Sequence, residues 1–320
     1  MILTVTLNAA LDRTLSVPNF QAGRRHRASD ALTLPGGKGV NVARALRNLG
    51  QPVIATGLAG GRTGISIIEQ LTAEGILNDF VRIADESRTS TAVVDPTSLQ
   101  QTEINEYGPS VADAELELLM EKLAYLSKGA DIVVLAGSLP RDVPADFYGV
   151  LVRELARPDL PIVVDVPGPP LRAALAEEPW LVSPNAREAE EVVGNEFSDD
   201  EDMVVGAEAL CSMGARSALV HDPGGCVARI GGHDGEDAGR TLTARIDVRS
   251  DVVSTVGSGD AFLAGFLAGT YDGDEVEQAL QRAVASGAAS TQLLGAGVVD
   301  RADVDALARQ VSVEELAAGA

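Results

Sequence analysis

The chain has 320 residues, of which 45% are hydrophobic and 22% charged, so it is long enough to bury the core of a sizeable α/β domain. Its formal net charge of −22 argues against nucleic acid and acidic membrane surfaces as partners, because both bind to positive potential. The two cysteines and three histidines lack metal-ligand spacing, which argues against a zinc site and a disulfide framework.

The N-terminal stretch MILTVTLNAALD predicts a first core strand, because Leu3, Val5 and Leu7 alternate along it. It lacks the basic leader of a signal peptide. No apolar run in the chain approaches the roughly 20 residues of a membrane span. We therefore expect a cytoplasmic protein.

Short apolar runs alternate with segments of helical periodicity along most of the chain. The runs ILTVTLN, PVIATGLAG, DIVVLAGS, LPIVVDV, WLVSPN and SALVH predict buried strands, with helix-like segments such as GVNVARALRNLG between them. This alternation predicts an α/β fold with a doubly wound, mostly parallel sheet and helices on both faces. Because ligands of such folds bind beyond the C-terminal ends of the strands, the residues after each strand are candidates for chemistry.

Two polar, β-prone segments, 13–34 and 88–107, interrupt the alternation and predict hairpins. They either pair into a small separate sheet that covers the strand ends as a lid, or form two ordinary surface hairpins; the pattern leaves both open. We expect a single domain, 1–320, with these segments inserted in it. Residues 231–240 predict a solvated loop, and the Ala- and Glu-rich tail from Val311 predicts a peripheral helix end.

The stretch LPGGKGVNVARAL, residues 34–46, is a glycine-rich turn that opens a helix. Gly36 and Gly37 free the backbone, Lys38 adds a positive charge, and Asn41 offers both a donor and an acceptor. This set suits a polyhydroxylated ligand. The alternative is a structural turn with a solvated lysine, although Lys38 is one of only three lysines in the chain.

Basic residues gather in the sequence GRRHR, which contains Arg24, Arg25 and Arg27, and Arg88 lies in the second polar segment. On a chain this acidic, they are natural candidates for binding a phosphate group. A solvated, charged hairpin is the alternative reading for Arg24 and Arg25.

In SPNAREAE, Asn185 follows a predicted strand and Glu188 lies three residues further on one helix face. A glutamate there can order water around a magnesium ion. The more frequent meaning of the pattern is a helix cap with a surface glutamate.

The stretch DVVSTVGSGDAFLAGF predicts a strand end at Val252, Val253 and Val256, a tight turn over 257–259, and a helix after Asp260. Free backbone N–H groups and the helix dipole at such a turn form an anion site. A carboxylate beside a phosphate is repulsive unless it has a role, such as accepting a proton from an attacking hydroxyl. The alternative is that Asp260 only caps its helix.

The motifs GGKGVNVARAL and DVVSTVGSGDAFLAGF resemble the two signatures of the ribokinase-like (PfkB) carbohydrate kinases. MILTVTLNAALD, QQTEINEYGP, LAGSLP and SPNAREAE look like the branch that contains 1-phosphofructokinase and tagatose-6-phosphate kinase. The resemblance runs, with gaps, from Met1 to about Asp303. It implies a ribokinase-like α/β core with a β-sheet lid that often serves dimerisation. It also implies transfer of the γ-phosphoryl group of ATP, with Mg²⁺, to a sugar hydroxyl.

Carried onto the matching positions, the resemblance makes Asp260 the catalytic base and Gly257, Ser258 and Gly259 the anion hole. The residues that it assigns to the sugar are Asp12, Gly37, Lys38 and Asn41. It assigns Arg27, Lys38 and Arg88 to the phosphate that the sugar already carries. It also places Glu103 and Ser138 in the lining of the same pocket. The residues that it assigns to the nucleotide are Asn185, Glu188 (to Mg²⁺ through water), His221, Gly224, Gly225, Ser258, Gly259 and Ser286.

This chain departs from the family pattern chiefly on the nucleotide side. Ser183 stands where a lysine is common, and HDPGGC, 221–226, replaces the usual SLG-x-x-G loop; Ala9 replaces a proline near the N-terminus. The resemblance favours fructose 1-phosphate as substrate, with fructose 6-phosphate and tagatose 6-phosphate as alternatives. The two nucleotide-side changes motivate a rival of another class, a non-catalytic sugar-phosphate sensor on a kinase scaffold.

Overall fold

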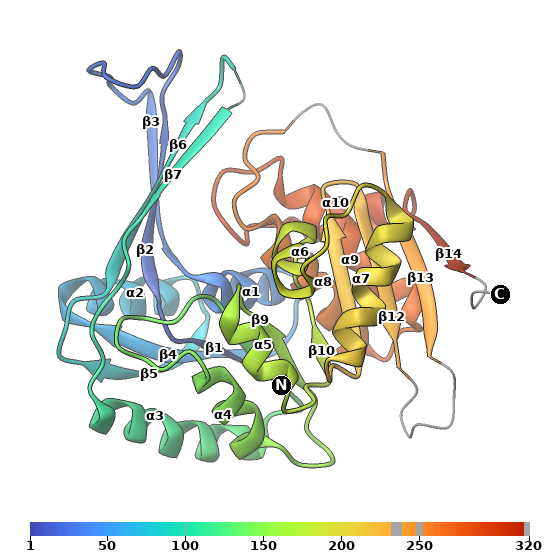
Figure 1. The fold of residues 1–320 in the computed structure, drawn as a ribbon. Coiled ribbons are helices and arrows are strands. Elements are labelled where there is room, and N and C mark those ends of the chain that lie inside the picture. The colour runs from blue at the N-terminus through green and yellow to red at the C-terminus, as the bar shows by residue number, and fades with distance from the viewer. Residues whose placement is uncertain (99, 232–238, 248–251, 317–320) are drawn as a thin grey trace.

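The computed structural model describes residues 1–98, 100–231, 239–247 and 252–316, which form a large helix-covered sheet and a small sheet projecting from it (Figure 1). In spatial order the large sheet contains β14 (Ser312–Leu316), β13 (Arg240–Arg245), β12 (Gly225–Ile230), β11 (Ser217–Asp222), β10 (Leu181–Val182), β9 (Ile162–Asp165), β8 (Ile132–Ala136), β1 (Ile2–Thr6), β4 (Val53–Gly60) and β5 (Leu77–Ile83). Neighbours from β11 to β5 are parallel, and those from β11 to β14 are antiparallel. The predicted mostly parallel sheet is confirmed.

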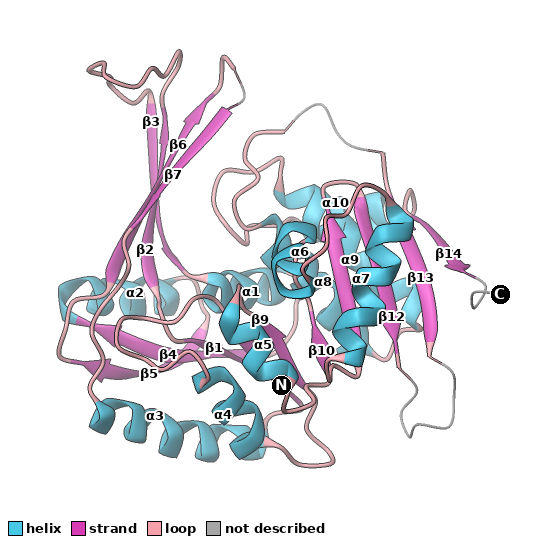
Figure 2. Cartoon of the chain, in the orientation of Figure 1, coloured by secondary structure: helices cyan, strands magenta, loops and turns pink. Residues whose placement is uncertain are grey.

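Helices cover both faces of this sheet, as predicted (Figure 2). One face carries α1 (Lys38–Asn48), α2 (Gly61–Ala73), α8 (Ser258–Asp272), α9 (Val276–Ser290) and α10 (Arg301–Ala308). The other carries α3 (Asp113–Leu126), α4 (Phe147–Leu155), α5 (Pro169–Leu175), α6 (Ala186–Val193) and α7 (Asp200–Ser212), with a 3₁₀ turn at Ser127–Gly129. No helix in these described ranges is long and apolar enough to cross a membrane.

Strand β1 shows why the central strands read as continuous apolar runs. Ile2 packs with the helices of the first face, whereas Leu3 and Val5 pack with those of the second. Side chains alternate along a strand, so a strand covered on both faces buries every residue. All five residues of β1 are buried.

The two polar segments form one sheet, which we call the lid. It contains β3 (Asp30–Gly36), β2 (Ala10–Ser16), β6 (Arg88–Asp95) and β7 (Gln100–Asn105), in that spatial order. Strands β2 and β6 pair in parallel, from Ala10 opposite Arg88 to Ser16 opposite Val94. The prediction of a small separate sheet is therefore confirmed, and Figure 1 shows it standing away from the helices.

The helix end predicted from Val311 is wrong, because Ser312–Leu316 forms strand β14. Pairing with β13 satisfies the backbone groups that β13 would otherwise leave open at the sheet edge. Arg240 fixes the pairing, since its guanidinium binds both Glu277 of α9 and Glu315 of β14.

Two of the predicted strand ends also differ from the structure. In residues 252–256, which the structure describes before the turn at 257–259, no strand forms. The N–H groups of Val253 and Ser254 instead donate to the carbonyl of Thr291, after α9 (2.7 and 3.1 Å). The strand predicted from WLVSPN shortens to Leu181–Val182, since Pro184 has no N–H to continue the pairing. Most of the loop predicted at 231–240 lies outside the described residues.

Helix α8 is buried at every position from Asp260 to Gly269, so its core side chains should stabilise the fold strongly. Replacing the fully buried Leu263 by Ala should lower the free energy of unfolding by about 2–5 kcal/mol. Val205→Ala on α7, where the side chain is 56% exposed, should change it by less than about 0.5 kcal/mol. Denaturant titrations of both variants measure these changes in the free energy of unfolding. Equal changes in the two variants would contradict the role of α8 as a core helix.

Candidate active site

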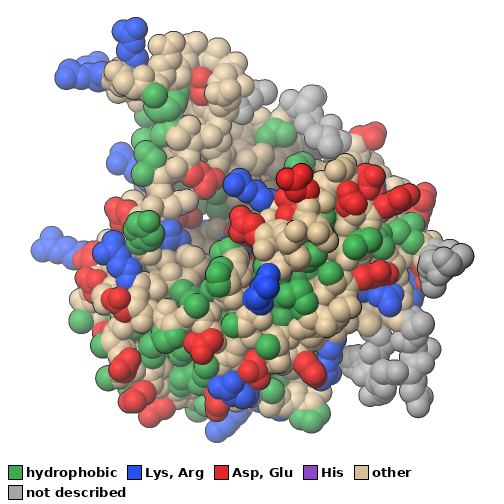
Figure 3. Space-filling view, in the orientation of Figure 1, with side chains coloured by type: hydrophobic (Ala, Val, Ile, Leu, Met, Phe, Trp, Pro, Cys, Tyr) green, Lys and Arg blue, Asp and Glu red, His purple; other side chains and the backbone are tan. Residues whose placement is uncertain are grey.

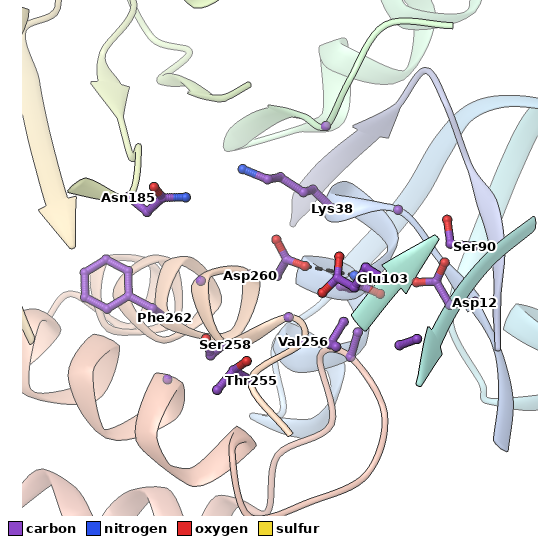
Figure 4. A pocket seen from close by; sticks show the side chains of 18 of the residues that line it. Asp12, Lys38, Ser90, Glu103, Asn185, Thr255, Val256, Ser258, Asp260 and Phe262 are labelled. Carbon is purple, nitrogen blue, oxygen red and sulfur yellow. Dashed lines mark hydrogen bonds between the residues drawn. The ribbon is translucent and has the colours of Figure 1, made fainter. Parts of the chain in front are cut away.

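A cavity of about 990 Å³ lies between the lid and the C-terminal ends of the parallel strands (Figure 4). Lid residues such as Asp12, Ser90 and Glu103 line one side of it, and residues from β9, α6 and α8 line the other. The cavity therefore lies where parallel α/β sheets bind their ligands. The candidate residues that line it are Asp12, Gly37, Lys38, Asn41, Arg88, Glu103, Ser138, Asn185, His221, Gly225, Gly257, Ser258, Gly259 and Asp260.

The N-terminal turn of α8 presents free N–H groups to this cavity. Gly257 precedes the helix in the left-handed conformation (φ 76°), and a Cβ there would lie 2.7 Å from that of Ala296. The N–H of Ser258 donates to Thr255 (3.3 Å), whereas those of Gly259 and Asp260 have no acceptor in the described part of the chain. These two N–H groups, at the positive end of the helix dipole, can donate to an anion in the cavity, and we call residues 257–260 the anion-binding turn.

Asp260 lies in the same turn, with only 6% of its surface exposed. Its Oδ2 accepts a hydrogen bond from Nδ2 of Asn41 on α1 (2.8 Å). Burial raises the pKa of Asp260 to about 7; the Asp165 carboxylate adds to this rise, whereas Lys38 and the Asn41 hydrogen bond oppose it. The group is thus poised to gain or lose a proton near neutral pH.

Lys38 points away from the lid and toward β9 and α6. Its Nζ donates to Oδ1 of Asp165 (2.8 Å) and to Oε1 of Glu188 (3.0 Å), and Figure 4 shows the ammonium group directed away from Asp12 and Ser90. Burial acts to lower the pKa of Lys38, but the two carboxylates outweigh it and raise the pKa above its usual value. Sequence reasoning missed Asp165, although a carboxylate at the end of the run PIVVD was a usable signal.

Asn185 and Glu188 form a reciprocal cap at the start of α6. The Asn185 side chain accepts from the N–H of Glu188 (2.9 Å), and Oε2 of Glu188 accepts from the N–H of Asn185 (3.1 Å). The capping alternative is therefore realised. The other oxygen of Glu188 faces Lys38, so the cap also fixes a carboxylate beside the cavity.

The lid side of the cavity contains an arginine that hydrogen bonds hold in place. Arg88 on β6 donates from Nη1 to Oγ of Ser90 (2.8 Å) and from Nε to the carbonyl of Asn8 (3.2 Å). Asn8, which sequence reasoning also missed, donates from Nδ2 to Oγ of Ser138 (3.1 Å). On the neighbouring lid strand β2, burial raises the pKa of Asp12, although the charge of Arg88 opposes this.

Four candidate residues do not line the cavity of this chain: Glu188, which lies beside it, Arg27, Ser286 and Gly224. Arg27 is exposed in the turn between β2 and β3, where Figure 3 shows basic side chains gathered at the end of the lid. Ser286 is buried between α8 and α9, where a Cβ at Gly265 would lie 2.5 Å from its Oγ. Gly224 lies in the turn between β11 and β12. An assignment from sequence resemblance gives no information on which way these side chains or backbone positions face.

His221, at the end of β11, packs against the anion-binding turn. Its ring lies 4.8 Å from that of Phe262, and a Cβ at Gly259 would lie 2.9 Å from its Cε1. Burial and the nearby Lys38 lower the pKa of His221 to about 4, so the ring is neutral at physiological pH. Arg187 on α6 also lines this side of the cavity and offers a positive charge where Ser183 does not.

Comparisons with known proteins agree with this fold. The profile of the pfkB family of carbohydrate kinases matches residues 4–301. A 1-phosphofructokinase of Borreliella burgdorferi is 31% identical over 316 residues, 99% of both chains. The structure of a possible 1-phosphofructokinase from Thermotoga maritima has a TM-score of 0.89 at 27% identity, covering 99% of this chain and 100% of that one. Phosphofructokinase-2 of Escherichia coli, in complex with substrates and products, has a TM-score of 0.87 at 27% identity over 96% and 98% of the two chains.

The chain belongs to the pfkB family of carbohydrate kinases. It is thus a phosphotransferase that acts on an alcohol group of a sugar.

The imidazole of His221 should stay neutral down to about pH 5, since burial and Lys38 hold its pKa near 4, below the roughly 6.5 of a free histidine. The ¹⁵N chemical shifts of the ring nitrogens report the protonation state, and His221→Gln assigns the signal. A His221 signal that titrates near pH 6.5 would contradict the packing described for β11 and α8.

Proposed function

We propose that the protein is a 1-phosphofructokinase, which transfers the γ-phosphoryl group of ATP to fructose 1-phosphate and produces fructose 1,6-bisphosphate. The observation that carries the proposal is the convergence of a buried carboxyl, Asp260, with the free N–H groups of its own helical turn. Arg88 on the sugar side supplies a positive charge for a substrate that already carries a phosphate. The names of two relatives support fructose 1-phosphate among the ketohexose phosphates.

In this proposal Asp260 takes the proton of the free primary hydroxyl of the sugar. As the proton leaves, the hydroxyl oxygen forms its bond to the γ-phosphorus, and the bond from phosphorus to the departing ADP oxygen breaks. The N–H groups of Gly259 and Asp260 donate to the negative charge that builds on the transferred group. Each donor of this kind typically contributes about 10²–10³ in rate.

The nucleotide side of the proposed site contains Asn185, His221, Gly225, Ser258 and Gly259. Asp165 and Glu188 offer carboxylate oxygens to a divalent cation beside it, and Lys38 binds one oxygen of each in this structure. Carboxylate oxygens suit Mg²⁺, which often keeps part of its water shell. When bound, Mg²⁺ neutralises phosphate charge, and these two carboxylates would hold it directly or through water.

We also propose that the protein is cytoplasmic and forms a homodimer through the lid. Strands β3 and β7 are the edges of the lid sheet, and Ile104 on β7 is 63% exposed. An exposed strand edge with an apolar side chain favours pairing with another chain. Arg27, which stands at the end of the lid, stays a proposed phosphate ligand only in such an assembly.

Two alternatives rest on particular observations. Phosphofructokinase-2 of Escherichia coli has been solved in complex with fructose-6-phosphate, which favours fructose 6-phosphate; tagatose 6-phosphate is the other ketohexose candidate. Ser183 and the His221 loop favour a sensor that binds a sugar phosphate without catalysis. Arg187 weighs against the sensor, since it restores a positive charge on the nucleotide side.

An assay of ADP release with fructose 1-phosphate, fructose 6-phosphate and tagatose 6-phosphate tests the proposal. We expect the highest kcat/KM with fructose 1-phosphate, and near-complete loss of turnover in Asp260→Asn with sugar-phosphate binding retained, since the amide cannot accept the proton. A higher kcat/KM with another sugar would change the substrate, and binding without turnover in the wild type would favour the sensor. Substantial turnover in Asp260→Asn would remove Asp260 as the base.

Replacing Arg88 by Ala should raise KM for the sugar phosphate by roughly 10- to 100-fold, because hydrogen bonds to charged groups contribute about 1.5–3 kcal/mol. KM for ATP should change little, since Arg88 lies on the lid side. The exposed Arg216, outside the cavity, provides the matched control Arg216→Ala, which should change neither constant. Equal effects of Arg88→Ala on both substrates would exclude a selective contact with the sugar phosphate.

A further inference from the structure

Arg44 of α1 is a buried arginine beside the site, with 4% of its surface exposed. All five of its N–H donors are used. Nε and Nη2 bind the two carboxylate oxygens of Glu74 (2.6 and 3.0 Å), and Nη2 also donates to the carbonyl of Pro35 (2.7 Å). Nη1 donates to Oδ1 of Asn41 (3.3 Å) and to the carbonyl of Ala296 (3.0 Å). The guanidinium therefore joins α1 to the end of α2, to β3 and to the segment around 296.

The contact with Asn41 fixes which way the amide of that residue points. A guanidinium group only donates hydrogen bonds, so the Asn41 oxygen must face Arg44. The NH₂ group of Asn41 then faces Asp260, whose ionised carboxylate only accepts. A rotated amide would place two donors together on one side and two acceptors on the other.

The contact with Ala296 supports the anion-binding turn from behind. A Cβ at Gly257 would lie 2.7 Å from Cβ of Ala296, so the turn before α8 rests directly on this segment. On the other side, Gly297 (φ 71°) packs so closely against α1 that a Cβ there would lie 2.3 Å from the carbonyl oxygen of Asn41. The segment is thus enclosed between α1 and the turn whose N–H groups face the cavity.

We propose that Arg44 is a positioning residue for phosphoryl transfer, which holds the Asn41 amide toward Asp260 and holds the Ala296 segment against the anion-binding turn. The inference rests on the proposed function only for its kinetic readout. Glu74 balances the charge of Arg44, so the guanidinium acts here through its planar set of donors. A lysine offers three donors on one atom and cannot reach the same acceptors at once.

Arg44→Lys should lower kcat by about 10²-fold, the loss that follows from small displacements of catalytic groups. KM for both substrates should change far less than kcat, since Arg44 itself does not line the cavity. The matched control is Arg157→Lys, which removes an arginine that donates to the carbonyls of Ser127 and Ala130 outside the cavity. Both variants should lower the melting temperature, but Arg157→Lys should leave kcat unchanged.

The pH dependence separates positioning from general loss of stability. The groups that act on Asp260 are Asp165 of β9, Lys38 and Asn41 of α1, and Asp12 of β2. The Asn41 hydrogen bond lowers the pKa of Asp260, so losing its orientation should move the acidic limb of the rate profile from about pH 7 to higher pH. ¹³C NMR of the Asp260 carboxyl in the substrate-free protein should show the same upward shift, whatever sugar the enzyme uses.

A double-mutant cycle with Asn41→Ala completes the test. If Arg44 acts through Asn41, the two losses in kcat should be clearly less than additive. The proposal would be overturned if the two losses in kcat were fully additive. It would also be overturned if Arg44→Lys left both kcat and the titration of Asp260 unchanged. Should Arg44→Lys not fold, Glu74→Gln loosens the same guanidinium group, and an unmoved Asp260 titration in that variant would overturn it equally. Inactivity of the wild type with every sugar phosphate would instead reject the proposed function and leave the NMR test intact.

Discussion

The carboxyl group of Asp260 is buried in the first turn of α8, and the rest of the site depends on how that burial is accommodated. Burial and the Asp165 carboxylate raise its pKa to about 7, while Lys38 and Asn41 oppose the rise. A group with such a pKa exchanges a proton readily at neutral pH. The same turn presents the N–H groups of Gly259 and Asp260, so one turn of helix fixes the distance between a proton acceptor and an anion-binding site.

In the proposed function, the anion-binding turn would let a chain with 25 basic and 47 acidic residues bind phosphates. Lys38 is already balanced by Asp165 and Glu188, so its charge is shared with two carboxylates. Backbone N–H groups and the helix dipole supply positive potential that does not depend on side-chain charge. Arg88 and Arg187 then need only add charge at the two ends of the cavity.

Local patterns in the sequence predicted the parts of the fold that local interactions decide. Strand–helix alternation predicted the sheet, and the glycines around Ser258 predicted the turn before α8. Features that depend on partners far along the chain were missed: Asp165 becomes part of the site only through Lys38, and Arg44 only through the segment at Ala296. The same reason explains β14, whose helix-like composition is overridden by pairing with β13. The family resemblance assigned Ser286 to the nucleotide, but its side chain turns into the crossing of α8 and α9.

The most direct test of the central claim is a crystal structure with fructose 1-phosphate and a non-hydrolysable ATP analogue. The account predicts a carboxylate oxygen of Asp260 within hydrogen-bond distance, about 2.6–3.2 Å, of the free primary hydroxyl of the sugar. It also predicts the terminal phosphate of the analogue on the N–H of Gly259. A terminal phosphate bound elsewhere, or a sugar whose free hydroxyl lies out of reach of Asp260, would contradict it.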